Sequence, residues 1–172
     1  MQKILTVYFS RKGQNYWNGS IVELEKGNAQ RAAEMVQKAV GGDLFEIRTV
    51  KQYAEEYRAC CEEAKRELRE GVRPQLESCP ASLDGYDILF VGYPNWCGTM
   101  PMAVFSFLEK YDLTGKKIAP FCSNEGSGMG RSEGDLKELC KGAQLVKGLS
   151  VRGSRTAESE GEIAAWARSA LE

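Results

Sequence analysis

The stretch Ile4–Phe9, with the sequence ILTVYF, is a nearly continuous run of residues that favour β-structure. A strand with one wet face alternates apolar and polar residues, whereas a run without that alternation is typical of a strand buried on both faces. The stretches 88–92 (ILFVG) and 118–122 (IAPFC) have the same character. We therefore expect a parallel sheet that is covered on both sides.

Amphipathic segments separate these apolar runs. The clearest is 29–40, where apolar residues recur at helical spacing, with Asn28 as the expected N-cap and Gly41–Gly42 as the stop. Two shorter strands are expected, over 44–47 and, weakly, around 145–151. The remaining predicted helices cover 54–70, 101–110, 132–141 and 160–171.

The predicted order is a strand followed by a helix, repeated along the chain. Such alternation, with right-handed crossovers, gives a doubly wound sheet. We therefore predict an α/β fold with a five-stranded parallel sheet in the order 2-1-3-4-5 and helices on both faces. Pro120 removes a donor from a central strand, so we expect either a bulge there or an amide position that faces a gap. The length fits a single domain over 1–172.

Composition excludes several classes of protein. The chain of 172 residues is 42% hydrophobic and has a net charge of −1, which is typical of a globular and not of a disordered protein. No apolar run approaches the ~18 residues of a membrane helix, and the N-terminal run is too short for a signal peptide. The balance of charges argues against binding to nucleic acid or to a membrane surface. We expect a cytoplasmic protein.

The chain has no histidine and six cysteines. A Ser-His-Asp triad, a Cys-His pair and a histidine-ligated zinc are therefore excluded. No Cys-x-x-Cys occurs, so the sequence contains neither a zinc ribbon nor a thioredoxin motif. We expect reduced thiols with a structural role, and Cys97 is the thiol whose reactivity merits a test.

Three loops follow the strands at 4–9, 88–92 and 118–122, and parallel strands place such loops at one edge of the sheet, where ligands bind. The gap from Ser10 to the helix start at Asn28 is longer than the ~2–6 residues of a usual strand-to-helix loop. The hydroxyl of Ser10, the nearby cations Arg11 and Lys12 and the free amides at the helix start together form a site that suits an anion. The alternative is an ordinary capped helix with a surface loop.

The other two loops suit a flat ligand. The loop Pro94–Pro101 carries Trp96 between two prolines, which is typical of contact with a planar partner, although the indole can instead pack on the core. The loop Ser123–Gly130 has three glycines, which allow a close approach of the backbone to a ligand, or alternatively make a flexible linker. Together the three loops fit a mononucleotide with a planar ring system.

On these residues the chain resembles the flavodoxin family, and most closely a branch with a Pro-Asn-Trp loop, over essentially its whole length. The resemblance implies a flavodoxin-like fold and noncovalent FMN. The phosphate would contact Ser10, Asn28 and Ala29, and the isoalloxazine would lie between the loops 94–99 and 123–128. The predicted cofactor-binding residues are Ser10, Arg11, Lys12, Asn15, Asn28, Ala29, Gln30, Pro94, Asn95, Trp96, Cys97, Gly98, Thr99, Ser123, Asn124, Gly126, Ser127 and Gly128.

Three positions depart from the pattern of that branch. Ala29 replaces a hydroxyl residue and so removes a donor worth about 1.5–3 kcal/mol to a charged phosphate, unless Lys12, Asn15 or Tyr16 compensates. Asn124–Glu125 stands where a His-Gly pair is frequent, so the proton donor of that histidine is absent. Cys97 stands where a second aromatic residue is common, which leaves the flavin face more open.

The resemblance implies a redox protein that transfers electrons through FMN to redox partner proteins or small electron acceptors. The alternative is an NAD(P)H-dependent FMN oxidoreductase of the quinone-reductase type, which the small Cys97 and the aromatic residues Tyr16 and Trp17 favour. A net charge of −1 weakens the carrier interpretation, since dedicated carriers often steer basic partners with acidic surfaces. A further alternative is a flavodoxin-like module that has lost its cofactor.

Overall fold

The central sheet has the order β4-β1-β5-β6-β7, and β8 also pairs with β6. This arrangement is that of a computed structural model, which describes residues 1–172. Every strand pair in this sheet is parallel. In chain order its strands are β1 (Ile4–Tyr8), β4 (Asp43–Glu46), β5 (Ile88–Pro94), β6 (Lys117–Asn124), β7 (Gln144–Leu145) and β8 (Leu149–Arg152). Counted along this sheet, the order is the predicted 2-1-3-4-5, with the fifth strand divided into β7 and β8.

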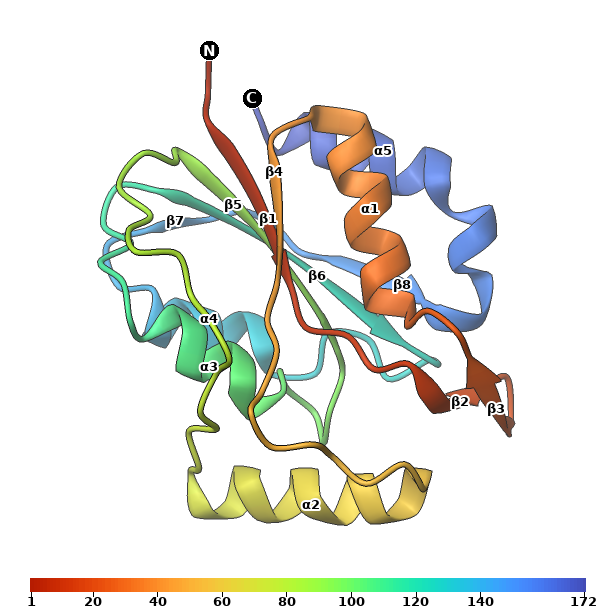
Figure 1. Ribbon diagram of the computed structural model, residues 1–172. Coiled ribbons are helices and arrows are strands. Elements are labelled where there is room, and N and C mark those ends of the chain that lie inside the picture. The colour runs from red at the N-terminus through yellow and green to blue at the C-terminus, as the bar shows by residue number, and fades with distance from the viewer.

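Helices cover both faces of the sheet, as predicted (Figure 1). One face carries α1 (Asn28–Val40) and α5 (Glu160–Ser169), with the 3-10 helix η1 (Gly153–Glu158) before α5. The other face carries α3 (Met102–Leu108) and α4 (Ser132–Leu139). The helix α2 (Tyr57–Glu70) runs across the lower part of the view, below the carboxyl ends of the strands. None of these helices is long and apolar enough to cross a bilayer.

Strand β1 shows why its run of apolar residues is continuous. Successive side chains point to opposite faces, so Leu5 and Val7 pack in the core beneath α3 and α4. Ile4 and Tyr8 pack in a second core beneath α1 and α5. Both faces of the strand are therefore dry, and neither needs polar residues.

Pro120 lies opposite the break between β7 and β8. Strand β6 pairs with β7 at Ile118 and resumes with β8 at Phe121, whereas on its other side Pro120 stays in register with Val91 of β5. The backbone of Ile118 accepts from Val146 on the β7 side, and position 120 points to that same side. The missing donor of Pro120 thus faces a gap, which is one of the two outcomes that the sequence predicted.

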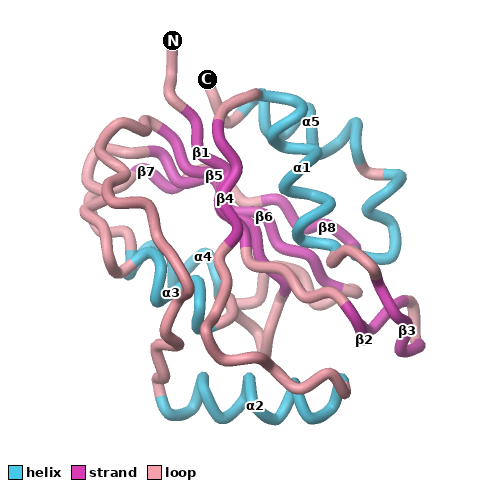
Figure 2. Tube along the Cα trace, in the orientation of Figure 1, coloured by secondary structure: helices cyan, strands magenta, loops and turns pink.

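A hairpin occupies most of the long first loop (Figure 2). Strands β2 (Gly13–Trp17) and β3 (Ser20–Leu24) pair antiparallel. The turn between them is Asn18–Gly19, and both residues have a positive φ. The sequence-based expectation for this segment was a loop, although Asn-Gly is the strongest short-range signal of a two-residue hairpin turn.

Three predicted boundaries were wrong. The N-cap of α1 is Gly27, and Asn28 is already helical, so Asn28 does not cap the helix. Helix α2 begins at Tyr57 and not at 54, with the Glu56 carboxylate accepting from the amide of Ala59. The weak strand expected around 145–151 is broken at 146–148.

Candidate functional site

The N-terminus of α1 is held by a hydroxyl from the preceding strand end. Gly27 has no side chain to cap the helix, and the amide of Gln30 donates to Ser10 Oγ at 3.1 Å. A Cβ on Gly27 would overlap Ser10 Oγ and lie 2.5 Å from the backbone oxygen of Arg11. The first intrahelical bond runs from Arg31 to Gly27, so the amides of Asn28 and Ala29 are left without intrahelical acceptors.

Asn28 has an unpaired amide oxygen at this helix start. Its side chain is buried, and Oδ1 has no hydrogen-bond partner. Gly153 lies against it, since a Cβ on Gly153 would be 2.5 Å from Asn28 Nδ2. An unpaired buried polar atom costs free energy and is exceptional in a folded protein, and Oδ1 as an acceptor would need a donor partner.

The loop after β5 ends in a tight turn. Trp96 and Thr99 exchange backbone hydrogen bonds of 2.9 and 3.2 Å, and the two residues between them, Cys97 and Gly98, both have positive φ. This is the pattern of a type I′ turn, which strains Cys97 because it is not glycine. Gly98 is fixed on both sides, by Asn95 Oδ1 at its amide and by the Arg131 amide at its oxygen.

Trp96 packs against the core and also lines a cavity. Its ring meets Phe9 and Tyr53 edge-on, with centroids 5.1 Å apart in both pairs. The indole is half-buried: part of it packs on the core, and part of it is open to the cavity, where its contact with a ligand stays a prediction.

One asparagine connects the second and third loops, and another holds the third loop in shape. Asn95 Nδ2 donates to the backbone oxygen of Gly128 at 2.9 Å. Asn124 Oδ1 accepts from the amides of Gly126 and Gly128, both at 3.0 Å, and its Nδ2 donates to Ser150. The amides of Gly126 and Gly128, which the sequence suggested as donors to a ligand, are therefore bonded to Asn124. These bonds hold the loop in a fixed shape.

The three loops converge on a cavity of about 280 Å³. Eleven of the predicted residues line it: Ser10, Arg11, Asn15, Asn28, Ala29, Pro94, Asn95, Trp96, Ser123, Asn124 and Ser127. Lys12 and Gln30 line a neighbouring cavity instead. Outside both cavities lie Cys97, Gly98, Thr99, Gly126 and Gly128. Thr99 is buried and its hydroxyl bonds the Asp135 carboxylate.

Four residues outside the predicted set also line this cavity: Tyr16, Tyr57, Glu125 and Gly153. Glu125 is 9% exposed and accepts two hydrogen bonds from Ser154, from its amide and its hydroxyl, both at 2.8 Å. Tyr57 opens α2, and burial raises the pKa of its phenol above the ordinary value, so the phenol stays protonated. Tyr16 comes from the hairpin, and the sequence suggested it as a compensating residue at the phosphate and as an aromatic residue that favours the reductase.

The hairpin is tied to the start of α2, which closes the cavity wall on that side. Arg11 donates to the backbone oxygens of Gln14 at 2.9 Å and Glu55 at 2.8 Å. Gln14 Oε1 accepts from the amide of Tyr57 at 2.8 Å. The bonds from Arg11 to Glu55 and from Tyr57 to Gln14 join segments about forty residues apart in the chain.

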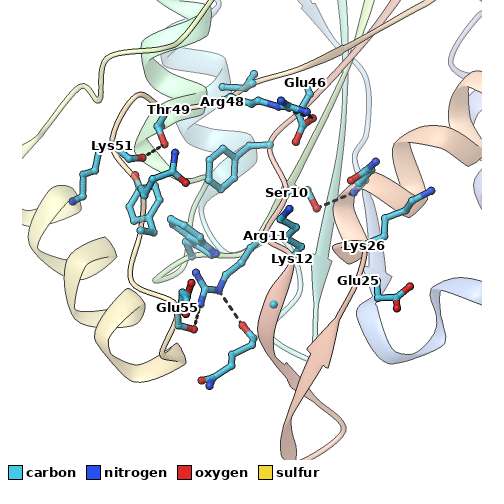
Figure 3. A pocket seen from close by; sticks show the side chains of 18 of the residues that line it. Ser10, Arg11, Lys12, Glu25, Lys26, Glu46, Arg48, Thr49, Lys51 and Glu55 are labelled. Atoms are coloured by element: carbon cyan, nitrogen blue, oxygen red, sulfur yellow. Dashed lines mark hydrogen bonds and ion pairs between the residues drawn. The ribbon is translucent and has the colours of Figure 1, made fainter.

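A larger cavity of about 760 Å³ adjoins the first one (Figure 3). It extends from the strand end at Ser10 to the end of β4 and the segment that leads into α2. Ser10, Arg11 and Trp96 line both cavities. In Figure 3, Arg11 and Lys12 lie centrally, with Glu46 and Arg48 at the top and Glu25 and Lys26 to the right.

The smaller cavity fits the phosphate of FMN at the start of α1. The two free helix amides are donors, and Ser10 accepts from Gln30 through its oxygen, which leaves its own hydroxyl proton free to donate. Arg11 adds a guanidinium that has no carboxylate partner. Ala29 supplies no hydroxyl, and the Glu125 carboxylate is an acceptor in a cavity that must hold a dianion.

Comparison with solved structures gives the same architecture. A protein from Bacteroides eggerthii DSM 20697, assigned as a flavoprotein, is 28% identical, covers 100% of this chain and 99% of its own, and has a TM-score of 0.79. A similarly assigned Bacteroides uniformis ATCC 8492 protein is 26% identical over 97% and 98% of the two chains, with a TM-score of 0.76.

A flavoprotein from Lactobacillus acidophilus NCFM, solved in complex with FMN, shares the fold at 15% identity, with a TM-score of 0.65 over 92% of this chain and 98% of its own. No curated protein matches the sequence. The family model described as flavodoxin matches residues 20–170. The chain therefore belongs to the flavodoxin family.

Proposed function

We propose that this protein binds FMN noncovalently in the cavity of about 280 Å³ and transfers electrons through it. The observation that carries the proposal is the open helix start at Asn28 and Ala29, on the same cavity as the loop that holds Trp96. Membership in the flavodoxin family supports FMN as the cofactor.

FMN supplies the capacity to accept and release electrons, and the residues of this chain hold it and set its surroundings. Ser10 and the free amides of α1 bind the phosphate, and Arg11 balances part of its charge. Trp96, Tyr16 and Tyr57 exclude water from the ring. The chain has no histidine, so a proton that accompanies an electron would come from water or from a carboxyl, phenol or thiol group of the chain.

Reconstitution tests the proposal directly. Purified protein is stripped of bound flavin, mixed with FMN and then passed through a desalting column. The expected result is a retained flavin absorbance spectrum with quenched flavin fluorescence, and two one-electron reduction potentials that differ from those of free FMN. Elution of colourless protein would refute the proposal and support the interpretation that the module has lost its cofactor.

The second candidate is an FMN-dependent reductase that takes hydride from NAD(P)H. The larger cavity favours it, because Ser10, Arg11 and Trp96 belong to both cavities and a small reactant there would lie beside the flavin. Anaerobic stopped-flow mixing of the FMN-loaded protein with NADPH separates the two candidates. Slow reduction that rises linearly with NADPH supports a carrier that serves redox partner proteins, whereas fast, saturable reduction supports the reductase.

A further inference from the structure

The larger cavity has the size and the walls of a binding site for a second small molecule. Its volume of about 760 Å³ lies within the ~300–1,000 Å³ of small-molecule sites. Several segments build it: the end of β1 with the start of β2, the stretch from β3 into α1, the end of β4 with the approach to α2, and the loops that hold Glu77 and Trp96. Its lining is mostly polar, unlike that of a packing defect in a core.

Two cations in this cavity have no carboxylate partner. Lys26, Arg48 and Lys51 also line it, but they pair with Glu34, Glu46 and the Glu63–Glu67 pair of acids respectively. No ion pair of the chain involves Arg11 or Lys12. Arg11 is held by two backbone oxygens, and Lys12 is exposed. Arg11 and Lys12 are therefore the two cations of this cavity that form no ion pair within the chain, and a phosphate is an anionic group that such side chains bind.

Carboxylates without partners lie around these cations. The side chains of Glu23, Glu25, Glu55 and Glu77 line the cavity and take part in no ion pair or side-chain hydrogen bond. A carboxylate accepts hydrogen bonds only, so these four suit the hydroxyl groups of a sugar or an amino group. Mixed charge of this kind suits a ligand with both anionic and donor groups.

The apolar part of the wall is aromatic. Phe9, Tyr53 and Trp96 pack edge-on to one another, with centroids 5.1 to 6.3 Å apart, and all three line the cavity. Aromatic side chains of this kind offer a planar ring both apolar surface and edge-to-face contact. The cavity thus combines a wall for a planar ring, acceptors for hydroxyls and cations for a phosphate.

We propose that this cavity binds a nucleotide beside the flavin, with its phosphate at Lys12, its ribose hydroxyls at the free carboxylates and its base against the aromatic wall. The inference rests on the proposed function in that FMN is taken to occupy the smaller cavity. Within the reductase candidate it assigns the place of the nicotinamide nucleotide. Within the carrier candidate it assigns a site for a nucleotide that affects the flavin.

Calorimetric titration of the FMN-saturated protein tests this site, with AMP, NADP⁺ and inorganic phosphate as separate probes. We expect one AMP or NADP⁺ per chain and weaker binding of phosphate alone. Lys12→Glu should weaken AMP binding by at least about tenfold, because it replaces a charge-assisted contact with a repulsion. Lys12 does not line the flavin cavity, so FMN affinity should fall much less than AMP affinity.

Lys26→Ala is the matched control, because Lys26 lines the same cavity but already pairs with Glu34 at 2.8 Å. It should weaken AMP binding by less than about threefold. Three results would overturn the proposal: absence of saturable AMP or NADP⁺ binding, equal binding by Lys12→Glu and the parent protein, or loss of AMP binding once FMN is present. A drop in FMN affinity in Lys12→Glu as large as the drop in AMP affinity would assign Lys12 to the flavin phosphate instead. None of these results alters the FMN reconstitution, which tests the proposed function separately.

Discussion

The hydroxyl of Thr6 is an unpaired polar group in the middle of β1. Thr6 is fully buried and its Oγ1 has no hydrogen-bond partner. Thr6→Val keeps the shape of the side chain and removes the hydroxyl, so we expect the free energy of unfolding to increase by about 1 kcal/mol. Urea unfolding followed by circular dichroism measures the change. A lower urea midpoint for Thr6→Val, with an unchanged dependence of the free energy of unfolding on urea concentration, would show that the Thr6 hydroxyl has a hydrogen-bond partner.

Ala29 is the residue at which the anion site at the start of α1 lacks a hydroxyl. Ala29→Ser adds a donor at the start of α1, and we expect FMN affinity to rise by about tenfold, since a hydrogen bond to a charged group is worth about 1.5–3 kcal/mol. Fluorescence titration with FMN measures this change. Riboflavin, which lacks the phosphate, is the control and should bind the variant and the parent equally. An equal gain for both ligands would show that the serine does not contact the phosphate.

At the scale of an element, the first turn of α1 depends on Gly27. A Cβ there would meet Ser10 Oγ and the Arg11 backbone, which cannot both move away. We expect Gly27→Ala to lower the free energy of unfolding by about 1–3 kcal/mol and to weaken FMN binding.

Gly161 in α5 is the matched control for that substitution. A Cβ on Gly161 would meet nothing within 4 Å, and its φ is not positive. Gly161→Ala should therefore raise the free energy of unfolding by about 0.5–1 kcal/mol, through the higher helix propensity of alanine. Thermal and urea unfolding of the two variants make the comparison. Similar effects of both substitutions would show that the close approach at Gly27 relaxes easily.

At the scale of the whole molecule, one wall of the flavin cavity is closed by side chains that bridge the hairpin and α2. Gln14→Ala removes the acceptor for the Tyr57 amide. We expect the dissociation rate of FMN to rise about fivefold, in proportion to one neutral hydrogen bond. Stopped-flow release of FMN into an excess of a flavin-binding trap protein measures the rate.

Gln37→Ala is the control for that measurement, because the Gln37 amide donates to Gly42 at the far end of α1 and is exposed. It should leave the dissociation rate of FMN unchanged. If Gln14→Ala also leaves the rate unchanged, FMN leaves the cavity without separating the hairpin from α2.

The sheet was predictable because each of its central strands is recognisable from its own residues. Dry faces on both sides of β1, β5 and β6 require continuous apolar runs, and these are visible without any tertiary information. The hairpin was not predicted because its strands are polar and half-exposed. The Asn18–Gly19 turn was its one sequence signal. The assignment to a Pro-Asn-Trp branch stays a prediction.

The candidate site was predictable only where a residue acts within its own loop. Ser10, Asn28 and Trp96 were found because each lies beside a strand end or a helix start. Tyr57 was not found, because the start of α2 is set by Gln14, about forty residues earlier. The larger cavity has no sequence signal at all, since several segments that lie far apart in the chain build its walls.

Asn95 and Asn124 have a consequence for how a ligand enters. Asn95 bonds the second loop to the third, and Asn124 holds the third loop in shape, through bonds that are complete before any ligand arrives. A loop that is already ordered loses little conformational entropy on association, so the binding free energy is not spent on arranging the walls. The cleft is therefore preorganised before its ligand binds. Amide hydrogen exchange at Gly126 and Gly128 should accordingly be slow both with and without FMN.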